Sequence, residues 1–163
     1  MFKDPEWVTE EEWNAYAWFG FAVSEARVIE RQLTILATAF AIQSQKRGDQ
    51  ESGWFELYDK HGRLTLGRLF KKIERSLDAE LVIDLKGVVE LRNDLAHEFF
   101  WPRKQSINDP DPTSEESIKK LEAIASKFRS LSSRLEPFID DIISKHGLEK
   151  KAVTEEAKRQ TSH

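Results

Sequence analysis

One short segment, residues 90–100 (ELRNDLAHEFF), holds the side chains best suited to act on a phosphate group. Arg92 is permanently charged and can donate two hydrogen bonds to phosphate oxygens. The imidazole of His97 can exchange a proton near neutral pH. Asn93 is four residues before His97, so these two share one face of a helix. The three residue types together predict chemistry on a phosphodiester.

The spacing within this segment poses a geometric problem. Arg92 and His97 are five residues apart, which is about 140° around a helix axis. One straight helix therefore does not aim both side chains at the same substrate atom. Either the helix ends or distorts here, or a second copy of the chain supplies the missing group.

Metal-independent cleavage of RNA needs three functions. A base takes the proton of the ribose 2′-OH, an acid protonates the leaving 5′-oxygen, and a cation stabilises the charged phosphorane. Each chain offers a single histidine in the motif, His97. A symmetric homodimer that joins two motifs would place two histidines and two copies of Arg92 around one phosphate.

The segment resembles the motif of the HEPN superfamily (higher eukaryotes and prokaryotes nucleotide-binding domains). That motif is an Arg, often followed by Asn or Asp, and then a His after four to six residues. The resemblance is motif-specific at 90–100 and extends over roughly 13–143 at the level of the fold. Its further elements are Leu95 and Ala96 before the histidine, the upstream Thr65-Leu66-Gly67-Arg68-Leu69, and the trailing Phe99-Phe100.

The resemblance implies an all-α, up-and-down bundle of four main helices and a homodimer with a composite site. It also implies a metal-independent endoribonuclease of the toxin or defence type, which leaves a cyclic phosphate. By this resemblance Arg92 binds phosphate, Asn93 positions it and His97 transfers protons. An antitoxin or another protein partner is expected. In HEPN toxins paired with a nucleotidyltransferase antitoxin, a Tyr stands two residues after the histidine. This chain has Phe99 at that position, so the sequence does not favour assignment to that toxin–antitoxin system.

The alternative is a non-catalytic helical dimer that acts as a regulatory module or binds RNA or protein. Proteins resembling the mannitol operon repressor family belong to this class and carry a similar Arg-Asn…Ala-His stretch. In that case Asn93 and His97 cap or stitch the helix end. Arg92 then pairs with a buried carboxylate.

The composition narrows the class of protein. The 163 residues suffice for one domain with a proper core, and the absence of cysteine suits a reducing compartment. We expect a cytoplasmic protein, since the chain shows no signal peptide and charged residues interrupt its longest apolar region. The histidines lack ligand spacing, so neither a metal nor another cofactor is expected.

Although the net charge is −4, cationic side chains concentrate locally. Residues 60–75 contain six Lys or Arg against one carboxylate, Glu74. Such a cluster is either a solvated helix face or a surface for the RNA backbone. A second candidate follows the motif, where aromatic residues 99–101 precede two cations. The predicted RNA-binding residues are Arg68, Lys71, Lys72, Arg103 and Lys104.

The first helix is predicted to begin at the capping box of Thr9 and Glu12. Its apolar residues form two stripes, and one bundle core needs only one of them. The second stripe favours a partner protomer or unusually deep burial. The stripes are Trp18, Ala22, Ala26, Ile29, Leu33, Leu36, Phe40 and Ala17, Phe21, Val28, Ile35, Ala39, Ile42.

Three further helices complete the bundle. We predict helix starts at Thr65, at Asp78, and at a second capping box of Thr113 and Glu116. Arg92 falls on the apolar stripe of the helix after Asp78, so it needs a carboxylate partner, either Glu25 or Glu30. A short helical piece is expected at 54–58, and Pro137 is expected to kink or restart the last helix. The folded domain is predicted at 1–147, followed by a polar tail at 148–163.

Overall fold

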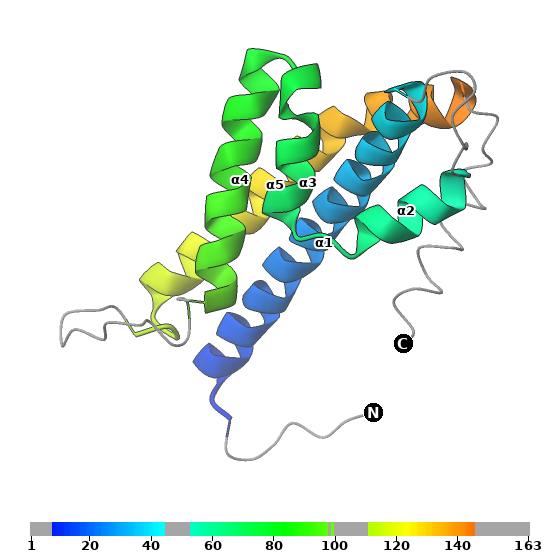
Figure 1. The fold of residues 1–163 in the computed structure, drawn as a ribbon. Helices are drawn as coiled ribbons and strands as arrows, with labels where there is room; N and C mark the ends of the chain where they lie inside the picture. Colours follow the sequence, from blue (N-terminus) through cyan, green and yellow to red (C-terminus); the bar gives the residue numbers. More distant parts are fainter. Residues whose placement is uncertain (1–7, 45–52, 98, 100–110, 146–163) are drawn as a thin grey trace.

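The computed structural model describes residues 8–44, 53–97, 99 and 111–145 (Figure 1). Within these ranges the chain forms α-helices, one short 3-10 helix and no strand, which confirms the all-α prediction. No helix among them is both long and apolar enough to cross a membrane. The elements are α1 (Glu10–Ser44), α2 (Trp54–Gly62), α3 (Leu66–Ile73), η1 (Glu74–Ser76), α4 (Ala79–His97) and α5 (Glu115–Lys145). The predicted tail at 148–163 lies outside the described residues.

Helix α1 begins at the predicted capping box. The backbone N–H of Thr9 donates to a Glu12 carboxylate oxygen at 2.8 Å, and the N–H of Glu12 donates to Thr9 Oγ1 at 3.2 Å. These bonds satisfy backbone donors that lack an intrahelical acceptor in the first turn. The start of the 35-residue helix is therefore set locally, as the sequence predicts.

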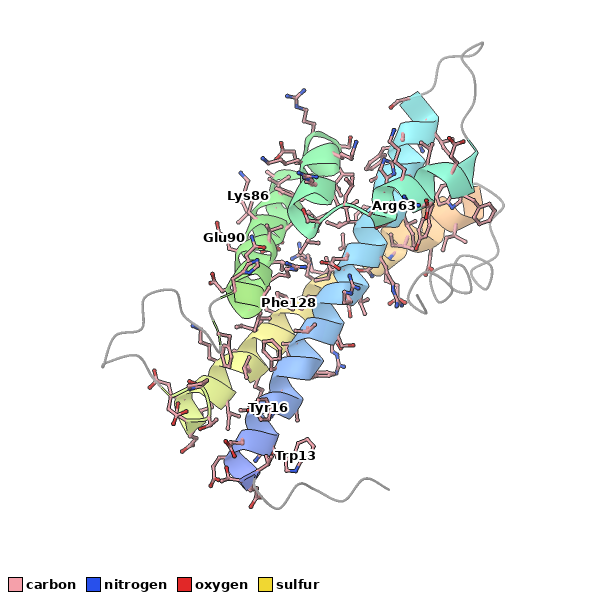
Figure 2. All side chains as sticks on the ribbon, turned by 60° about the horizontal axis from the view of Figure 1, so that its bottom comes forward. Trp13, Tyr16, Arg63, Lys86, Glu90 and Phe128 are labelled. Atoms are coloured by element: carbon pink, nitrogen blue, oxygen red, sulfur yellow. The ribbon has the colours of Figure 1, made fainter. Side chains whose placement is uncertain are left out.

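The core lies between α1 and α5, which run side by side in the same direction (Figure 1). Ile29 and Leu33 of α1 and Leu121 and Phe128 of α5 are fully buried there. Figure 2 shows Phe128 between the two helices. Each such side chain contributes about 1.5–3 kcal/mol on burial. The first predicted stripe of α1 is confirmed as the core stripe.

The start of α5 differs from the prediction by one residue. The N–H of Ser117 donates to Ser114 Oγ at 3.2 Å, so Ser114 caps the helix. The predicted box of Thr113 and Glu116 is wrong, because both the N–H and the hydroxyl of Thr113 donate to the carboxylate of Asp111. The helix also continues through Pro137 without a restart.

Helices α3 and α4 form a hairpin through η1. Asp78 caps α4 as predicted, since its carboxylate accepts the N–H of Leu81 at 2.8 Å. Thr65 stands at the cap position of α3, but its side chain makes no capping hydrogen bond. The inward positions of both helices are confirmed by burial. They are Leu66, Leu69, Phe70 and Ile73 in α3 and Leu81, Leu85, Val88 and Leu95 in α4.

The second apolar stripe of α1 has two different environments. Ile35 and Ala39 in the C-terminal half are buried, and Thr38 beside them contacts His61 of α2. Ala17 and Val28 in the N-terminal half are exposed. Burial within the chain thus accounts for half of the stripe, and the other half stays open. The short helical piece predicted at 54–58 is the nine-residue α2.

A buried histidine joins α2 to α1. His61 is 3% exposed, and its Nδ1 lies 3.1 Å from Thr38 Oγ1. The Thr38 hydroxyl donates its only proton to the carbonyl of Thr34 at 2.8 Å, so His61 Nδ1–H donates to Thr38. Burial lowers the pKa of His61, and the charges of Lys72 and Lys60 lower it further.

We predict that this histidine makes stability depend on pH. In the unfolded chain His61 binds a proton below its ordinary pKa of 6.5. In the folded chain its pKa is lower, so it binds that proton only at a lower pH. The free energy of unfolding should therefore fall as pH drops below 6.5, by up to about 1.4 kcal/mol per pH unit. Urea unfolding between pH 5 and 7.5 measures this loss. His61→Asn should lack it, and an identical slope in this variant would contradict the assignment.

Candidate functional site

Arg92 anchors the end of α4 to α1. Its Nε lies 3.4 Å from a carboxylate oxygen of Glu30, and the side chains of Arg92 and Glu30 are 31% and 12% exposed. Glu30 also accepts a hydrogen bond from Arg27 at 2.9 Å. The other candidate partner, Glu25, pairs instead with Arg129 of α5 at 2.8 Å. Glu30 is therefore the carboxylate that the sequence requires for Arg92.

A hollow of about 370 Å³ opens beside this ion pair, between α1 and α4. Its charged lining residues are Arg27 and Glu30 of α1 and Arg92 of α4. The remaining lining residues are Val23, Ala26, Leu95 and Ala96. Neither Asn93 nor His97 lines it. The hollow thus holds the cation of the motif without its proton-transfer group.

Asn93 and His97 lie on a different side of α4. The helix is continuous from Ala79 to His97, so it neither ends nor distorts between Arg92 and His97. The two side chains are consequently about 140° apart around the axis. Both Asn93 and His97 are exposed, and neither bonds to another side chain in the described part of the protein. A single protomer does not bring the motif together around one atom.

The face of α4 that carries His97 continues into a second groove. Lys86, Glu90, Asn93 and His97 follow one another at steps of four, three and four residues, which is one helix face. Lys86 and Glu90 lie on the outer side of α4, away from α1 (Figure 2). They line a groove of about 370 Å³ against α3. Its other lining residues are Thr65, Gly67, Arg68, Phe70, Lys71, Glu74 and Val89.

The structure places three of the five predicted RNA-binding residues. Arg68 and Lys71 line this groove, on the His97 side of α4. Lys72 is exposed on α3 but is absent from the groove lining, and its charge acts on His61 instead. Arg103 and Lys104 lie outside the described residues.

The sequence reasoning missed Lys86 and Glu90. The four- and three-residue steps that lead from Lys86 to His97 are visible in the sequence and could have pointed to them. Their importance depends on α3, which supplies the second wall of the groove. Arg68, Lys71 and Lys86 form no ion pair within the described residues, so their charges are available to an anionic ligand.

Phe99 packs rather than presenting its ring to a ligand. It is half-buried against the core, and its ring centroid lies 6.0 Å from that of Phe19. Phe100 and Trp101, which could stack on bases, lie outside the described residues. Among the described side chains, no three His, Asp or Glu residues gather where they could hold a metal ion.

Comparisons with models of protein families, with curated proteins and with solved structures gave no match. The chemistry of the site therefore follows from its own groups. One side of α4 presents a paired guanidinium in a hollow. The other side presents an exposed imidazole and amide in line with a groove that carries three cations.

We predict that Glu30→Gln destabilises the fold by about 1–2 kcal/mol. The substitution leaves the partly buried guanidinium of Arg92 without its counter-charge. The expected loss of stability therefore lies between the loss from breaking a surface ion pair and the loss from breaking a buried one. Urea unfolding measures the difference. Glu10→Gln is the matched control, because Glu10 is exposed and forms no ion pair in the described residues. Equal stability of the two variants would show that Arg92 does not need Glu30.

Proposed function

We propose that the protein is a metal-independent endoribonuclease with a HEPN-like helical fold, acting in the cytoplasm as a homodimer with a composite site. The observation that carries this proposal is the exposed His97 at the end of a helix face that begins in a groove lined by three cations and two carboxylates. The groove would hold the phosphates of an RNA strand, and His97 stands where that strand leaves it.

In this mechanism the ribose 2′-oxygen attacks phosphorus and the bond to the 5′-oxygen breaks, which leaves a 2′,3′-cyclic phosphate. His97 of one chain accepts the 2′-OH proton, and the partner's His97 protonates the leaving oxygen. Arg92 stabilises the phosphorane charge. Arg92 meets Glu30 through Nε at 3.4 Å, and in this mechanism its terminal nitrogens donate to phosphate. Asn93, one helical turn before His97, positions the same phosphate.

Phe99 bears on how such an enzyme would be controlled. It has no hydroxyl, and its ring packs on the core beside Phe19. Silencing through modification of a tyrosine at this position is therefore not available. An antitoxin, if one partners this chain, would act by binding.

We predict that the purified protein cleaves a mixed RNA pool in excess EDTA and that His97→Ala abolishes the cleavage while leaving the fold intact. Folding should survive because His97 is exposed at the last residue of α4. Gel analysis of the products measures cleavage, and circular dichroism checks the fold. Ile83→Ala is the matched control, since Ile83 is 69% exposed on the same helix. Full cleavage by pure His97→Ala protein would contradict the assignment.

The groove between α3 and α4 makes a separate prediction about binding. Lys86→Ala should weaken the binding of a labelled single-stranded RNA and lower the slope of log K against log salt by about 0.7. Fluorescence anisotropy over a KCl series measures both. The control is Lys120→Ala, an exposed lysine of α5 without an ion pair in the described residues. Identical losses for the two variants would exclude the groove as the RNA track.

The second candidate function is a non-catalytic helical dimer that binds RNA or protein for regulation. The ion pair of Arg92 with Glu30 favours it, because a structural role accounts for this arginine without any substrate. Under this function, His97→Ala changes partner binding or stability alone. Binding of RNA to the groove without cleavage in the EDTA assay would favour the second candidate over the first.

A further inference from the structure

The hollow between α1 and α4 is larger than the cleavage step requires, because Arg92 is the only lining residue to which that step gives a role. Its volume is about 370 Å³. An engineered cavity of about 150 Å³ takes up a benzene ring, so the hollow has room for a two-ring base. Its aliphatic lining comes from both helices, with Val23 and Ala26 from α1 and Leu95 and Ala96 from α4. A planar ring that enters between the helices therefore meets apolar side chains of both.

Glu30 places hydrogen-bond acceptors in this hollow. Arg27 donates to its Oε2 at 2.9 Å, and Nε of Arg92 lies 3.4 Å from its Oε1. An ionised carboxylate has about four acceptor positions on its two oxygens. Each oxygen of Glu30 therefore keeps acceptor capacity for a ligand while both ion pairs stay in place. The two arginines fix the direction of the carboxylate.

The order of donors and acceptors at this carboxylate distinguishes between bases. Arg27 stays paired with Glu30 through one terminal nitrogen, and a guanidinium has further N–H donors beside it. The pair thus presents a donor followed by two acceptors. The Watson–Crick edge of guanine presents the complementary order, the O6 acceptor followed by the N1–H and N2–H donors. No other RNA base has two adjacent donors beside an acceptor on that edge.

The charge of the lining suits a nucleotide rather than a neutral molecule. The guanidinium groups of Arg27 and Arg92 carry two positive charges, and Glu30 carries one negative charge. A neutral base alone leaves one positive charge without a counter-charge. A nucleotide brings a phosphate that supplies it, and Arg92 can hold that phosphate with two parallel hydrogen bonds.

We propose that the hollow binds the guanine base of a guanosine next to the cleaved phosphate, so that the substrate is RNA cut beside guanosine. Glu30 accepts the N1–H and N2–H groups, and Arg27 donates to O6. Arg92 holds the phosphate attached to that nucleoside. Guanine binding stands without the proposed function, and only the place of the guanine within an RNA substrate rests on it.

Binding of free nucleotides tests the guanine site without any cleavage. Isothermal titration calorimetry compares 5′-GMP with 5′-AMP, 5′-CMP and 5′-UMP, which differ from it in the base while the phosphate stays the same. 5′-IMP is the closest comparison, because it lacks only the N2 amino group that Glu30 would accept. GMP should bind at least about tenfold more tightly than each of the others. Equal affinities of the five nucleotides would overturn the proposal.

Two variants locate the site in the hollow. Ala96→Leu fills the hollow from an exposed position and should remove the preference for GMP, whereas Ala79→Leu, an exposed alanine of the same helix outside the hollow, should keep it. Glu30→Gln turns one acceptor into a donor and should bring the affinity for GMP down to that for IMP. Circular dichroism checks that each variant is folded. An unchanged preference for GMP in Ala96→Leu would place the base elsewhere and overturn the proposal.

Mapping of cleavage sites separates a guanosine of RNA from a free nucleotide. RNA cut by the wild type in EDTA should show breaks beside guanosine, and replacing guanosine by inosine should slow cleavage by about tenfold. Breaks without regard to guanosine would overturn the RNA assignment. A preference for GMP without any RNA cleavage would contradict the proposed function and identify a free guanine nucleotide as the ligand. Cleavage without a preference for GMP would overturn the guanine site and leave the proposed function intact.

Discussion

The contact between Arg92 and Glu30 fixes the arrangement of the candidate site. A guanidinium on the inward side of a helix is costly unless a carboxylate meets it, and Glu30 of α1 does so at 3.4 Å. This contact ties the last turns of α4 to the middle of α1. The hollow beside it, and the direction in which the rest of the motif points, follow from that attachment.

An unbroken helix then separates the motif into two sides. With Arg92 held toward α1, the geometry of α4 turns Asn93 and His97 outward. The outward side is also the one on which Arg68, Lys71 and Lys86 gather. A single chain thus keeps a paired cation on one side of α4 and an imidazole in line with unpaired cations on the other. Two chains can join the sides if their α4 ends are brought together.

The helix starts and the need of Arg92 for a carboxylate partner could be predicted from the sequence, because they depend on residues close together in the chain or on one helix face. The capping box at Thr9 and the cap at Asp78 need only nearby residues, and the position of Arg92 on an apolar stripe implied a carboxylate on the first helix. The start of α5 was missed because Asp111 takes both donors of Thr113, a competition that spacing does not reveal.

Features that depend on distant packing were not predictable in the same way. Ile35 and Ala39 are buried in the half of α1 where Thr38 contacts His61 of α2. Their apolar pattern alone did not distinguish burial within the chain from burial by a partner. Lys86 lines a groove only because α3 supplies the opposite wall, which the sequence of α4 alone does not show. Spacing along one helix therefore shows which residues share a face, but not what that face meets.

The most direct test of the account is subunit exchange between the wild type and His97→Ala. One His97 accepts the 2′-OH proton and the partner's His97 protonates the leaving oxygen, so a mixed dimer lacks one of the two groups. The two chains would be mixed in varied ratios at constant total concentration, allowed to exchange subunits, and assayed for RNA cleavage in EDTA. The account predicts that cleavage falls with the square of the wild-type fraction. Cleavage that falls only in direct proportion to the wild-type fraction would contradict it.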